Sequence, residues 1–465
     1  MSIAFTRRAV AGGVAASLVS LHAKAAPAPA AAPTPAPAPA AEPRILEARA
    51  SAQQLAPLPA AASDLSTFEG SAPGPLLRYR QGDELFVRLV NTLDRPLSLH
   101  WAGLRGDNAM DGVAPLTQAP VPPGGRFDYR RKLVDAGLYL YRPAIFPDSA
   151  RLVAHGLKGL LLVEEQTPLD VDADYVLALD AWRLDAKGRP LAADEAVSAD
   201  GAPAATRLTV DGKPAPATRE AEPGARIRLR LANLSASRLM ILSFDGAQPF
   251  VIAIDGQPCD AFEPVRRTIP VAPGARFDLM FDLPAAENAR MRLILHGEDG
   301  AEQDLFVIAG KGAPRQGADR KGADRKPIAA APDNRLLPAE IKLAQSKKVD
   351  LVIDREAGGA FTLNGARSKA YDGPPLFRVA KGTPVTLGFV NKTDAILSLR
   401  PHGFAVRLLH DLDDGWEPYW RNSVVVPPKK TKHIAFLADS PGKWALHDDF
   451  LEHEAAGLAT WFEVA

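Results

Sequence analysis

The residues best suited to chemistry lie close to the C-terminus of this 465-residue chain. His447 is followed by Asp448 and Asp449, and His453 comes a few residues later. Imidazole and carboxylate groups bind metal ions, share protons and pair with cations, so this stretch indicates a metal site or a proton-sharing pair. The only cysteine, Cys259, lies in another part of the chain, which excludes an internal disulfide and a cysteine-rich metal site.

Short segments of alternating apolar and polar residues must position these side chains. The strand-like run Leu85-Phe-Val-Arg-Leu-Val-Asn has counterparts that begin at Ile227 and Val385, each with a glycine turn upstream and an asparagine at its end. A second repeated unit follows each of these runs and begins at Pro122, Val271 and Val426. One β-unit is therefore present three times, with a period of roughly 150 residues that fits a domain better than a solenoid repeat. The alternation predicts half-buried strands packed into β-sandwiches.

Two compositionally biased tracts divide the chain. Residues 26–43 are almost entirely alanine and proline, which predicts an extended linker. Residues 311–334 are basic, polar and aperiodic, which predicts an exposed linker between domains. We therefore expect domains at residues 44–166, 167–310 and 335–465.

The N-terminal segment, residues 1–25, is typical of a twin-arginine export signal. Arg7 and Arg8 precede an apolar run from Ala9 to Leu21, and a small-residue cleavage site follows. A general secretory signal or an uncleaved anchor are the alternatives, although the run is too short to span a bilayer. We expect a periplasmic protein whose mature chain has no transmembrane segment.

Composition limits the possible partners and the secondary structure. Lys and Arg total 55, as do Asp and Glu, so charge gives no basis for binding nucleic acid or an anionic membrane. The 42 prolines and 36 glycines favour β-structure with many turns. We expect a monomer that binds a periplasmic protein partner whose identity the sequence does not reveal.

The order and spacing of several motifs resemble those of the multicopper oxidases, across nearly all of the chain outside the linkers. The segments that carry the resemblance include Pro73-Gly-Pro-Leu-Leu-Arg, His100-Trp-Ala-Gly-Leu, Met110-Asp-Gly-Val, Gly156-Leu-Lys-Gly-Leu-Leu-Leu-Val, Ile254-Asp-Gly-Gln-Pro and the stretch from His447 to Leu458. The resemblance implies an all-β protein of three cupredoxin-like Greek-key β-sandwich domains. It also implies an oxidase activity that depends on a type 1 copper and a three-copper cluster.

Most positions that would bind copper in this family hold other residue types here. The resemblance places Leu397, Asp448, His453 and Leu458 at the type 1 site, which leaves one imidazole and no thiolate. At the three-copper cluster it places His100, Ala102, Arg142, Ala144, Arg400, His402, His447 and Asp449. A guanidinium stays protonated and is not a practical metal ligand, so these replacements predict the loss of the oxidase activity.

Two pairs of replaced positions predict specific contacts. Arg142 and Asp449 would ligate the same copper in the family, so their side chains must converge, and we expect a buried salt bridge between them. Asp448 and His453 converge in the same way at the type 1 position. A hydrogen bond between them would keep the imidazole protonated or fix its tautomer.

The three remaining histidines leave two interpretations open. His402 and His447 would face one copper position and His100 the neighbouring one, so the three imidazoles could bind zinc or a single copper ion. The alternative is that they are core residues, hydrogen-bonded to the backbone or to Asp449.

Two functions compete for this chain. The first is a binding or scaffold protein without catalytic residues, because one periplasmic branch of the superfamily lacks copper ligands and supports the cell-division machinery. The second is an oxidoreductase with an altered metal site built on His100, His402 and His447. We expect no cofactor under the first interpretation, and copper or zinc under the second.

Overall fold

A computed structural model describes residues 42–56, 61–192, 204–297, 299–312, 327–332, 334, 336–410 and 415–465. The expected export signal lies outside these residues, as do most of the two expected linkers. The described part contains no helix with the length and apolar composition needed to cross a membrane. The boundaries between the domains stay predictions.

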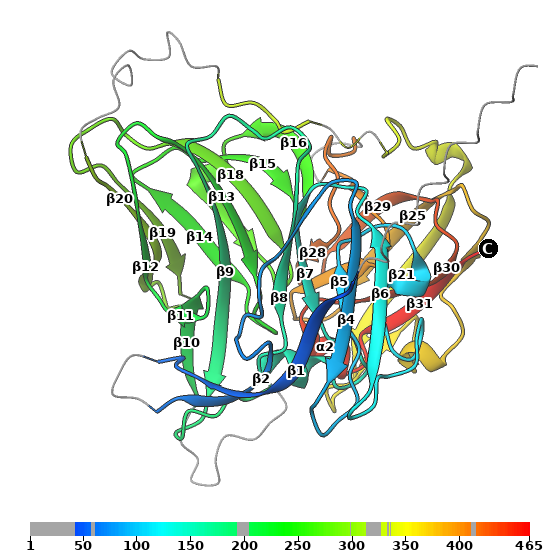
Figure 1. Cartoon of the computed structure of the whole chain (residues 1–465). Coiled ribbons are helices and arrows are strands. Elements are labelled where there is room, and N and C mark those ends of the chain that lie inside the picture. Colours follow the sequence, from blue (N-terminus) through cyan, green and yellow to red (C-terminus); the bar gives the residue numbers. More distant parts are fainter. Residues whose placement is uncertain are drawn as a thin grey trace, which may run out of the picture. The chain divides into compact units, whose positions relative to one another are not determined.

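The described residues form six β-sheets, which pack as three sandwiches, each around its own hydrophobic core (Figure 1). This arrangement confirms the all-β prediction of three cupredoxin-like domains. In chain order the sheets of the first sandwich are β2-β1-β4-β6 and β3-β8-β7-β5, those of the second are β11-β10-β9-β13-β18-β15-β16 and β12-β20-β19-β14-β17, and those of the third are β23-β22-β21-β25-β29-β27 and β24-β31-β30-β26-β28.

The strands of the first sandwich are β1 (Arg44–Gln53), β2 (Ser63–Phe68), β3 (Leu77–Arg80), β4 (Glu84–Asn91), β5 (His100–Ala102), β6 (Arg126–Lys132), β7 (Gly137–Arg142) and β8 (Gly159–Glu164). Those of the second are β9 (Ala173–Leu184), β10 (Ala205–Val210), β11 (Lys213–Pro214), β12 (Ala217–Ala221), β13 (Arg226–Asn233), β14 (Met240–Asp245), β15 (Phe250–Ile254), β16 (Gln257–Phe262), β17 (Thr268–Val271), β18 (Arg276–Asp282), β19 (Arg290–His296) and β20 (Glu302–Gly310).

The strands of the third sandwich are β21 (Lys347–Arg355), β22 (Phe361–Leu363), β23 (Ala366–Arg367), β24 (Arg378–Val379), β25 (Thr383–Asn391), β26 (Leu397–Pro401), β27 (Arg407–Leu408), β28 (Val424–Val426), β29 (Thr431–Ala438), β30 (Gly442–Asp448) and β31 (Ala459–Val464). The helical segments are short: α1 (Ser149–Ala154), α2 (Leu451–Ala455) and the 3-10 turns η1 (Asn108–Met110), η2 (Val265–Arg267), η3 (Leu343–Gln345) and η4 (Ala370–Asp372).

The repeated strand found in the sequence occupies the same place in each sandwich. It forms β4, β13 and β25, and each copy pairs in parallel with the first strand of its sandwich and antiparallel with β6, β18 or β29. The terminal asparagine explains why the pattern recurs, because its side-chain amide donates to a backbone carbonyl at the start of the second repeated unit. The bonds run from Asn91 to Val121 over 3.0 Å, from Asn233 to Val271 over 2.8 Å and from Asn391 to Val426 over 3.3 Å.

Two short helices bring the first and third sandwiches together beside the C-terminal motif. Ala150 and Val153 of α1 pack with Leu451 of α2 in one buried cluster. The hydroxyl of Ser149 donates a hydrogen bond of 3.3 Å to the carboxylate of Glu454 in the other helix. The helices therefore close the end of the chain over the strands that hold its histidines.

Candidate metal centre

Four strands from the first and third sandwiches carry the residues singled out in the sequence. In the first sandwich β5 pairs with β7, which places His100 directly opposite Arg142. In the third sandwich β26 pairs with β30, which places Arg400 directly opposite His447. Directly opposed residues on antiparallel strands project from the same face, with Cβ atoms about 5 Å apart. Each of these two histidines therefore has an arginine as its nearest neighbour across the sheet.

His100, His402 and His447 form a buried group, which we call the histidine cluster. Their relative exposures are 2%, 2% and 3%. The ring centroids of His100 and His402 lie 4.0 Å apart, and those of His402 and His447 lie 4.8 Å apart. The Nε2 atoms of all three rings are buried and have no hydrogen-bond partner among the described residues. The structure thus brings together the three histidines that the sequence indicated.

Asp111 fixes the orientation of two of these rings. The Nδ1 atom of His100 lies 2.8 Å from the backbone oxygen of Asp111, and Nδ1 of His402 lies 2.9 Å from its carboxylate. A carbonyl oxygen can only accept a hydrogen bond, so Nδ1 of His100 carries the proton and its Nε2 presents a lone pair. Sequence reasoning missed Asp111 as a site residue, although it stands in the Met110-Asp-Gly-Val segment that carried the resemblance.

Burial keeps the imidazoles of His100 and His402 neutral. It lowers the pKa of His100 to about 4, with a further contribution from His402 and an opposing one from Asp111. Burial likewise lowers the pKa of His402, again against the effect of Asp111. Burial alone would raise the pKa of the Asp111 carboxyl, but the two histidines outweigh it and hold that pKa well below its usual range. Neutral imidazoles with free Nε2 atoms are the form that binds metal ions.

His447 is held less tightly than the other two rings. Neither ring nitrogen has a hydrogen-bond partner among the described residues. Its Nε2 lies 3.9 Å from Asp449, and its Nδ1 lies 3.6 Å from the carboxylate of Glu454, which is 2% exposed. Glu454 was also missed in the sequence, because nothing in its spacing distinguishes it from Glu452, the other acidic residue of α2.

Arg142, Arg400 and Asp449 form a second buried group, which we call the arginine–aspartate cluster. The expected pair is present, since Nη2 of Arg142 lies 2.6 Å from Asp449. Arg400 was not expected there, but its Nη2 and Nε atoms lie 2.7 Å and 2.8 Å from the same carboxylate. Burial would raise the pKa of Asp449, but Arg400 and Arg142 hold it well below its usual range.

The middle sandwich closes the arginine–aspartate cluster through Gly274. Its backbone oxygen accepts a hydrogen bond of 3.1 Å from Arg400. Gly274 has a φ of +74°, and a Cβ atom there would lie 3.1 Å from Arg400 and 3.3 Å from Asp449. This close approach requires glycine at the position. The cluster thus joins groups from all three sandwiches.

The type 1 position holds a hydrogen-bonded acid–imidazole pair. Asp448 accepts a hydrogen bond of 2.9 Å from Nδ1 of His453, as expected. Its other oxygen accepts bonds from the backbone N–H groups of Ser398 and Phe450. Leu397 and Leu458 lie in the surrounding hydrophobic core with exposures of 0% and 1%. The carboxylate is fully engaged and the flanking side chains are aliphatic, so these residues do not fit a type 1 copper.

The remaining cluster positions offer no ligand atoms. Ala102 and Ala144 are buried, with exposures of 0% and 7%, and their methyl groups pack in separate apolar clusters. Together with the arginine–aspartate cluster they fill positions where imidazoles would be needed. Ligand atoms of His100, Asp111 and His402 lie within 4.8 Å of one another, which fits one metal ion, and the neighbouring residues do not fit three.

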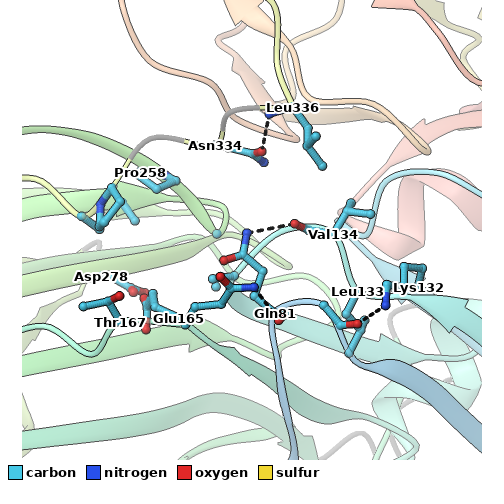
Figure 2. Close-up of a pocket in the computed structure, with 18 of the residues that line it drawn as sticks. Gln81, Lys132, Leu133, Val134, Glu165, Thr167, Pro258, Asp278, Asn334 and Leu336 are labelled. Atoms are coloured by element: carbon cyan, nitrogen blue, oxygen red, sulfur yellow. Dashed lines mark hydrogen bonds between the residues drawn. The ribbon is translucent and has the colours of Figure 1, made fainter.

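Two of the cavities among the described residues are large and lie outside the histidine cluster. A cavity of about 840 Å³ is lined in part by His453 and Glu452, and burial raises the pKa of Glu452. Figure 2 shows the other, of about 600 Å³, where the side-chain amide of Gln81 donates to the backbone oxygen of Val134 over 3.0 Å and Glu165 lines one end. None of the three clustered histidines lines either cavity.

Comparison with known proteins assigns the N-terminal and C-terminal parts of the chain to the same family. Family models described as multicopper oxidase match residues 49–168 and 342–465. The chain belongs to the multicopper oxidase family. It is 28% identical over 441 residues to the multicopper oxidase MmcO of Mycobacterium tuberculosis, which covers 85% of this chain and 82% of that protein.

Solved structures of similar proteins span nearly the whole chain. A multi-copper oxidase from Pseudomonas thermotolerans has a TM-score of 0.77 and 28% identity, covering 91% of this chain and 99% of its own. Lac15 from a marine microbial metagenome has a TM-score of 0.73 and 30% identity, covering 91% of this chain and 100% of its own.

The expectation that this chain has no cofactor is wrong in the light of these relatives. Proteins named as multicopper oxidases match it over most of its length, and they point to copper as the cofactor. That expectation rested on the non-ligand residues found in each of the copper-binding motifs, taken one motif at a time. It gave too little weight to three surviving histidines, which lie far apart in the sequence but share one buried location in the structure.

Proposed function

We propose that this multicopper oxidase family protein holds a single copper ion on the histidine cluster and does not carry out the oxygen reduction of a four-copper enzyme. The observation that supports the proposal is the group of three buried Nε2 atoms without partners among the described residues. A buried polar atom without a partner costs about 1–3 kcal/mol, so these atoms favour a ligand that would satisfy them. Ligand atoms of His100, Asp111 and His402 also lie within 4.8 Å of one another, close enough for one ion.

The loss of the electron entry point supports a role other than oxidation. Oxidases of this family need a type 1 copper to pass electrons to the cluster, and that position holds Asp448 with Leu397 and Leu458. The carboxylate of Asp448 is already bonded to His453 and to two backbone N–H groups. The sequence contains one cysteine, Cys259, and burial raises the pKa of its thiol to about 12, so it supplies no thiolate.

Asp111 and the arginine–aspartate cluster have specific roles in this proposal. Bound copper would supply a cation with accessible redox chemistry. Asp111 holds the rings of His100 and His402 so that their Nε2 atoms point away from it. The arginine–aspartate cluster fills the neighbouring space and joins the sandwiches that carry the histidines. These contacts set the geometry before any ion arrives.

The cellular setting is part of the proposal. The twin-arginine segment supports export to the periplasm, a route that serves proteins folded around a cofactor as well as some without one. A non-catalytic binding or scaffold role in the cell envelope follows from the missing type 1 ligands and from analogy with a copper-poor branch of the family. Capture of partners from periplasm on the purified mature protein tests that role.

Metal analysis of the purified mature protein tests the copper site. We expect about one copper per chain, no blue charge-transfer band, and loss of the copper in a His402→Ala variant. His433→Gln is the control, because that half-buried histidine lies in β29, outside the cluster. Four coppers per chain with a blue colour would overturn the proposal, and so would a metal-free protein that takes up no added copper.

An oxidoreductase with an altered metal site is the second candidate, favoured by the oxidase names of the relatives. Oxygen uptake in the presence of a phenol or of cuprous ion distinguishes the two. We expect no uptake above that of the His402→Ala variant.

A further inference from the structure

We propose that Lys158 and Asp180 form an amide cross-link that joins the first sandwich covalently to the second. Lys158 directly precedes β8 of the first sandwich, and Asp180 lies in β9 of the second. Neither residue belongs to the histidine cluster or to the arginine–aspartate cluster. The cross-link is therefore independent of the proposed copper site.

The amine of Lys158 and the carboxyl group of Asp180 are held in contact away from solvent. Nζ lies 2.7 Å from Oδ2, and the two side chains are 2% and 1% exposed. Lysine is almost never buried to this extent, so the position requires an explanation. Reacting groups held together in a suitable orientation reach effective concentrations on the order of 10⁵–10⁸ M. The fold thus supplies the proximity that condensation of an amine with a carboxyl group needs.

This pair is poorly stabilised as two ions. Oδ1 of Asp180 accepts a hydrogen bond of 2.9 Å from the backbone N–H of Ala181. Oδ2 accepts no hydrogen bond of normal geometry from any described residue, despite the nearby amine. The carboxylate of Asp449, by contrast, accepts hydrogen bonds from both Arg142 and Arg400. A buried ion pair without such bonds does not recover the free energy lost on leaving water, which favours a neutral alternative.

Burial shifts both groups toward the forms that react. It lowers the pKa of Lys158 and raises the pKa of Asp180, although each group opposes the shift of the other. A neutral amine has the lone pair needed for attack, and a protonated carboxyl group has a hydroxyl that can leave. The ring of Trp182 lies 4.0 Å from Nζ, and its Nε1 donates a hydrogen bond of 2.9 Å to Thr209. This fixed ring limits the movement of the amine beside the carboxyl group.

The reaction balances without a further reactant. The lone pair of Nζ attacks Cγ of the protonated Asp180 carboxyl group, and a C–N bond forms. A C–O bond breaks, and the departing hydroxyl takes one proton from the nitrogen and leaves as water. Nothing is oxidised or reduced. The neutral amide that remains replaces two buried charges.

The cross-link closes a loop that contains β8 and the connection to β9. A covalent bond across a loop restricts the unfolded chain and so stabilises the folded one. It also fixes the start of the second sandwich against the first, at the one place where the chain passes between them.

Mass spectrometry of the denatured mature protein tests the cross-link. We expect a mass about 18 Da below that of the same chain without the bond, which is the loss of one water. Trypsin does not cleave after an acylated lysine, and Lys158 is the only lysine or arginine between Arg151 and Arg183. Residues 152–183 should therefore appear as a single peptide that is lighter by one water.

Asp180→Ala should restore the full mass and the cleavage after Lys158. Lys311 and Glu220 provide a matched control, because their charged groups also lie 2.7 Å apart but their side chains are 71% and 59% exposed. An exposed pair stays solvated and charged, so trypsin should cleave after Lys311 as usual. If Asp180→Ala does not fold, the peptides of the wild type still decide the matter.

A wild-type protein of full mass that is cleaved after Lys158 overturns the proposal. The same loss of water with cleavage after Lys158 retained also overturns it, because the water has then left from another place, such as an aspartate that reacts with its own backbone.

Refolding gives a second measurement. Chain isolated unfolded in urea should have the full mass and should lose water only after refolding, at a rate that does not depend on protein concentration. Loss of water in urea, or a rate that rises with protein concentration, contradicts a reaction inside the folded chain.

Discussion

The guanidinium of Arg142 donates a hydrogen bond of 2.6 Å to the carboxylate of Asp449, and so joins the first sandwich to the last across 307 residues of sequence. Both side chains are almost completely buried, at 3% and 0% exposure. Multicopper oxidases hold copper between these two sandwiches. In this chain a buried ion pair of opposite charges occupies the same place.

Removal of one partner of this ion pair should destabilise the fold. Arg142→Met leaves Asp449 with Arg400 alone, and Asp449→Asn leaves two buried arginines without a counter-charge. Breaking a buried pair costs about 3–5 kcal/mol, and we expect Asp449→Asn at the upper end of that range. Urea unfolding measures the difference.

An exposed ion pair gives the control for that measurement. Arg367 and Glu356 lie 2.5 Å apart, but their side chains are 67% and 41% exposed. Arg367→Met should change the free energy of unfolding by less than about 1 kcal/mol. Equal effects of Arg142→Met and Arg367→Met would contradict the importance given to the buried pair.

Asp111 should control copper affinity through the rings that it orients. In Asp111→Asn the backbone carbonyl that accepts from His100 remains, while the carboxylate contact to His402 is lost. Changes to groups that orient metal-binding histidines weaken metal affinity about 10–100-fold, and we expect this range. Asp135→Asn, at a buried aspartate paired with Arg105, should leave copper affinity unchanged. Unaltered affinity in Asp111→Asn would show that the rings do not need this carboxylate.

Acid should weaken the contact between the second and third sandwiches at Asp255. Its carboxylate accepts hydrogen bonds from the backbone N–H groups of Asn422 and Ser423, both over 3.0 Å. Burial opposes ionisation, but Arg276 and Arg400, together with these bonds, hold the pKa of Asp255 below its usual value.

A depressed pKa in the folded state means that Asp255 stabilises the fold above its unfolded pKa of about 3.9. That contribution is lost as the pH falls through the lower, folded pKa. Unfolding measured from neutral pH down to about pH 3 should therefore show a steeper loss of stability in the wild type than in Asp255→Asn. If the free energy of unfolding falls equally with pH in wild type and in Asp255→Asn, Asp255 does not contribute to the acid sensitivity.

Two substitutions should restore a blue copper site. Asp448→Cys together with Leu397→His recreates a trigonal set of one thiolate and two imidazoles with His453, and such sites are strongly coloured. We expect the double variant to bind one additional copper and to turn blue, whereas Leu397→His alone should stay colourless. A colourless double variant that folds and binds no additional copper would show that these side chains do not converge as the strand positions indicate.

The sequence by itself determined the architecture of this protein. Alternating residues, glycine turns and a recurring terminal asparagine are local signals, and each copy specifies the same strands because Asn91, Asn233 and Asn391 make equivalent hydrogen bonds. The pairing of Arg142 with Asp449 was also readable, because the family resemblance places both residues at the same copper position.

Only the tertiary structure decided what the surviving residues form together. The resemblance placed Arg400 at the three-copper cluster, but only the structure showed that it shares Asp449 with Arg142. Asp111 and Glu454 lie beside the clustered histidines, and the sequence did not single out either of them. The structure also showed that the Nε2 atoms of the three histidines have no hydrogen-bond partner in the described part of the chain, and that Asp111 contacts the Nδ1 side of two of the rings. Sequence order cannot supply that information, because burial and hydrogen-bond partners depend on which distant segments pack against each other.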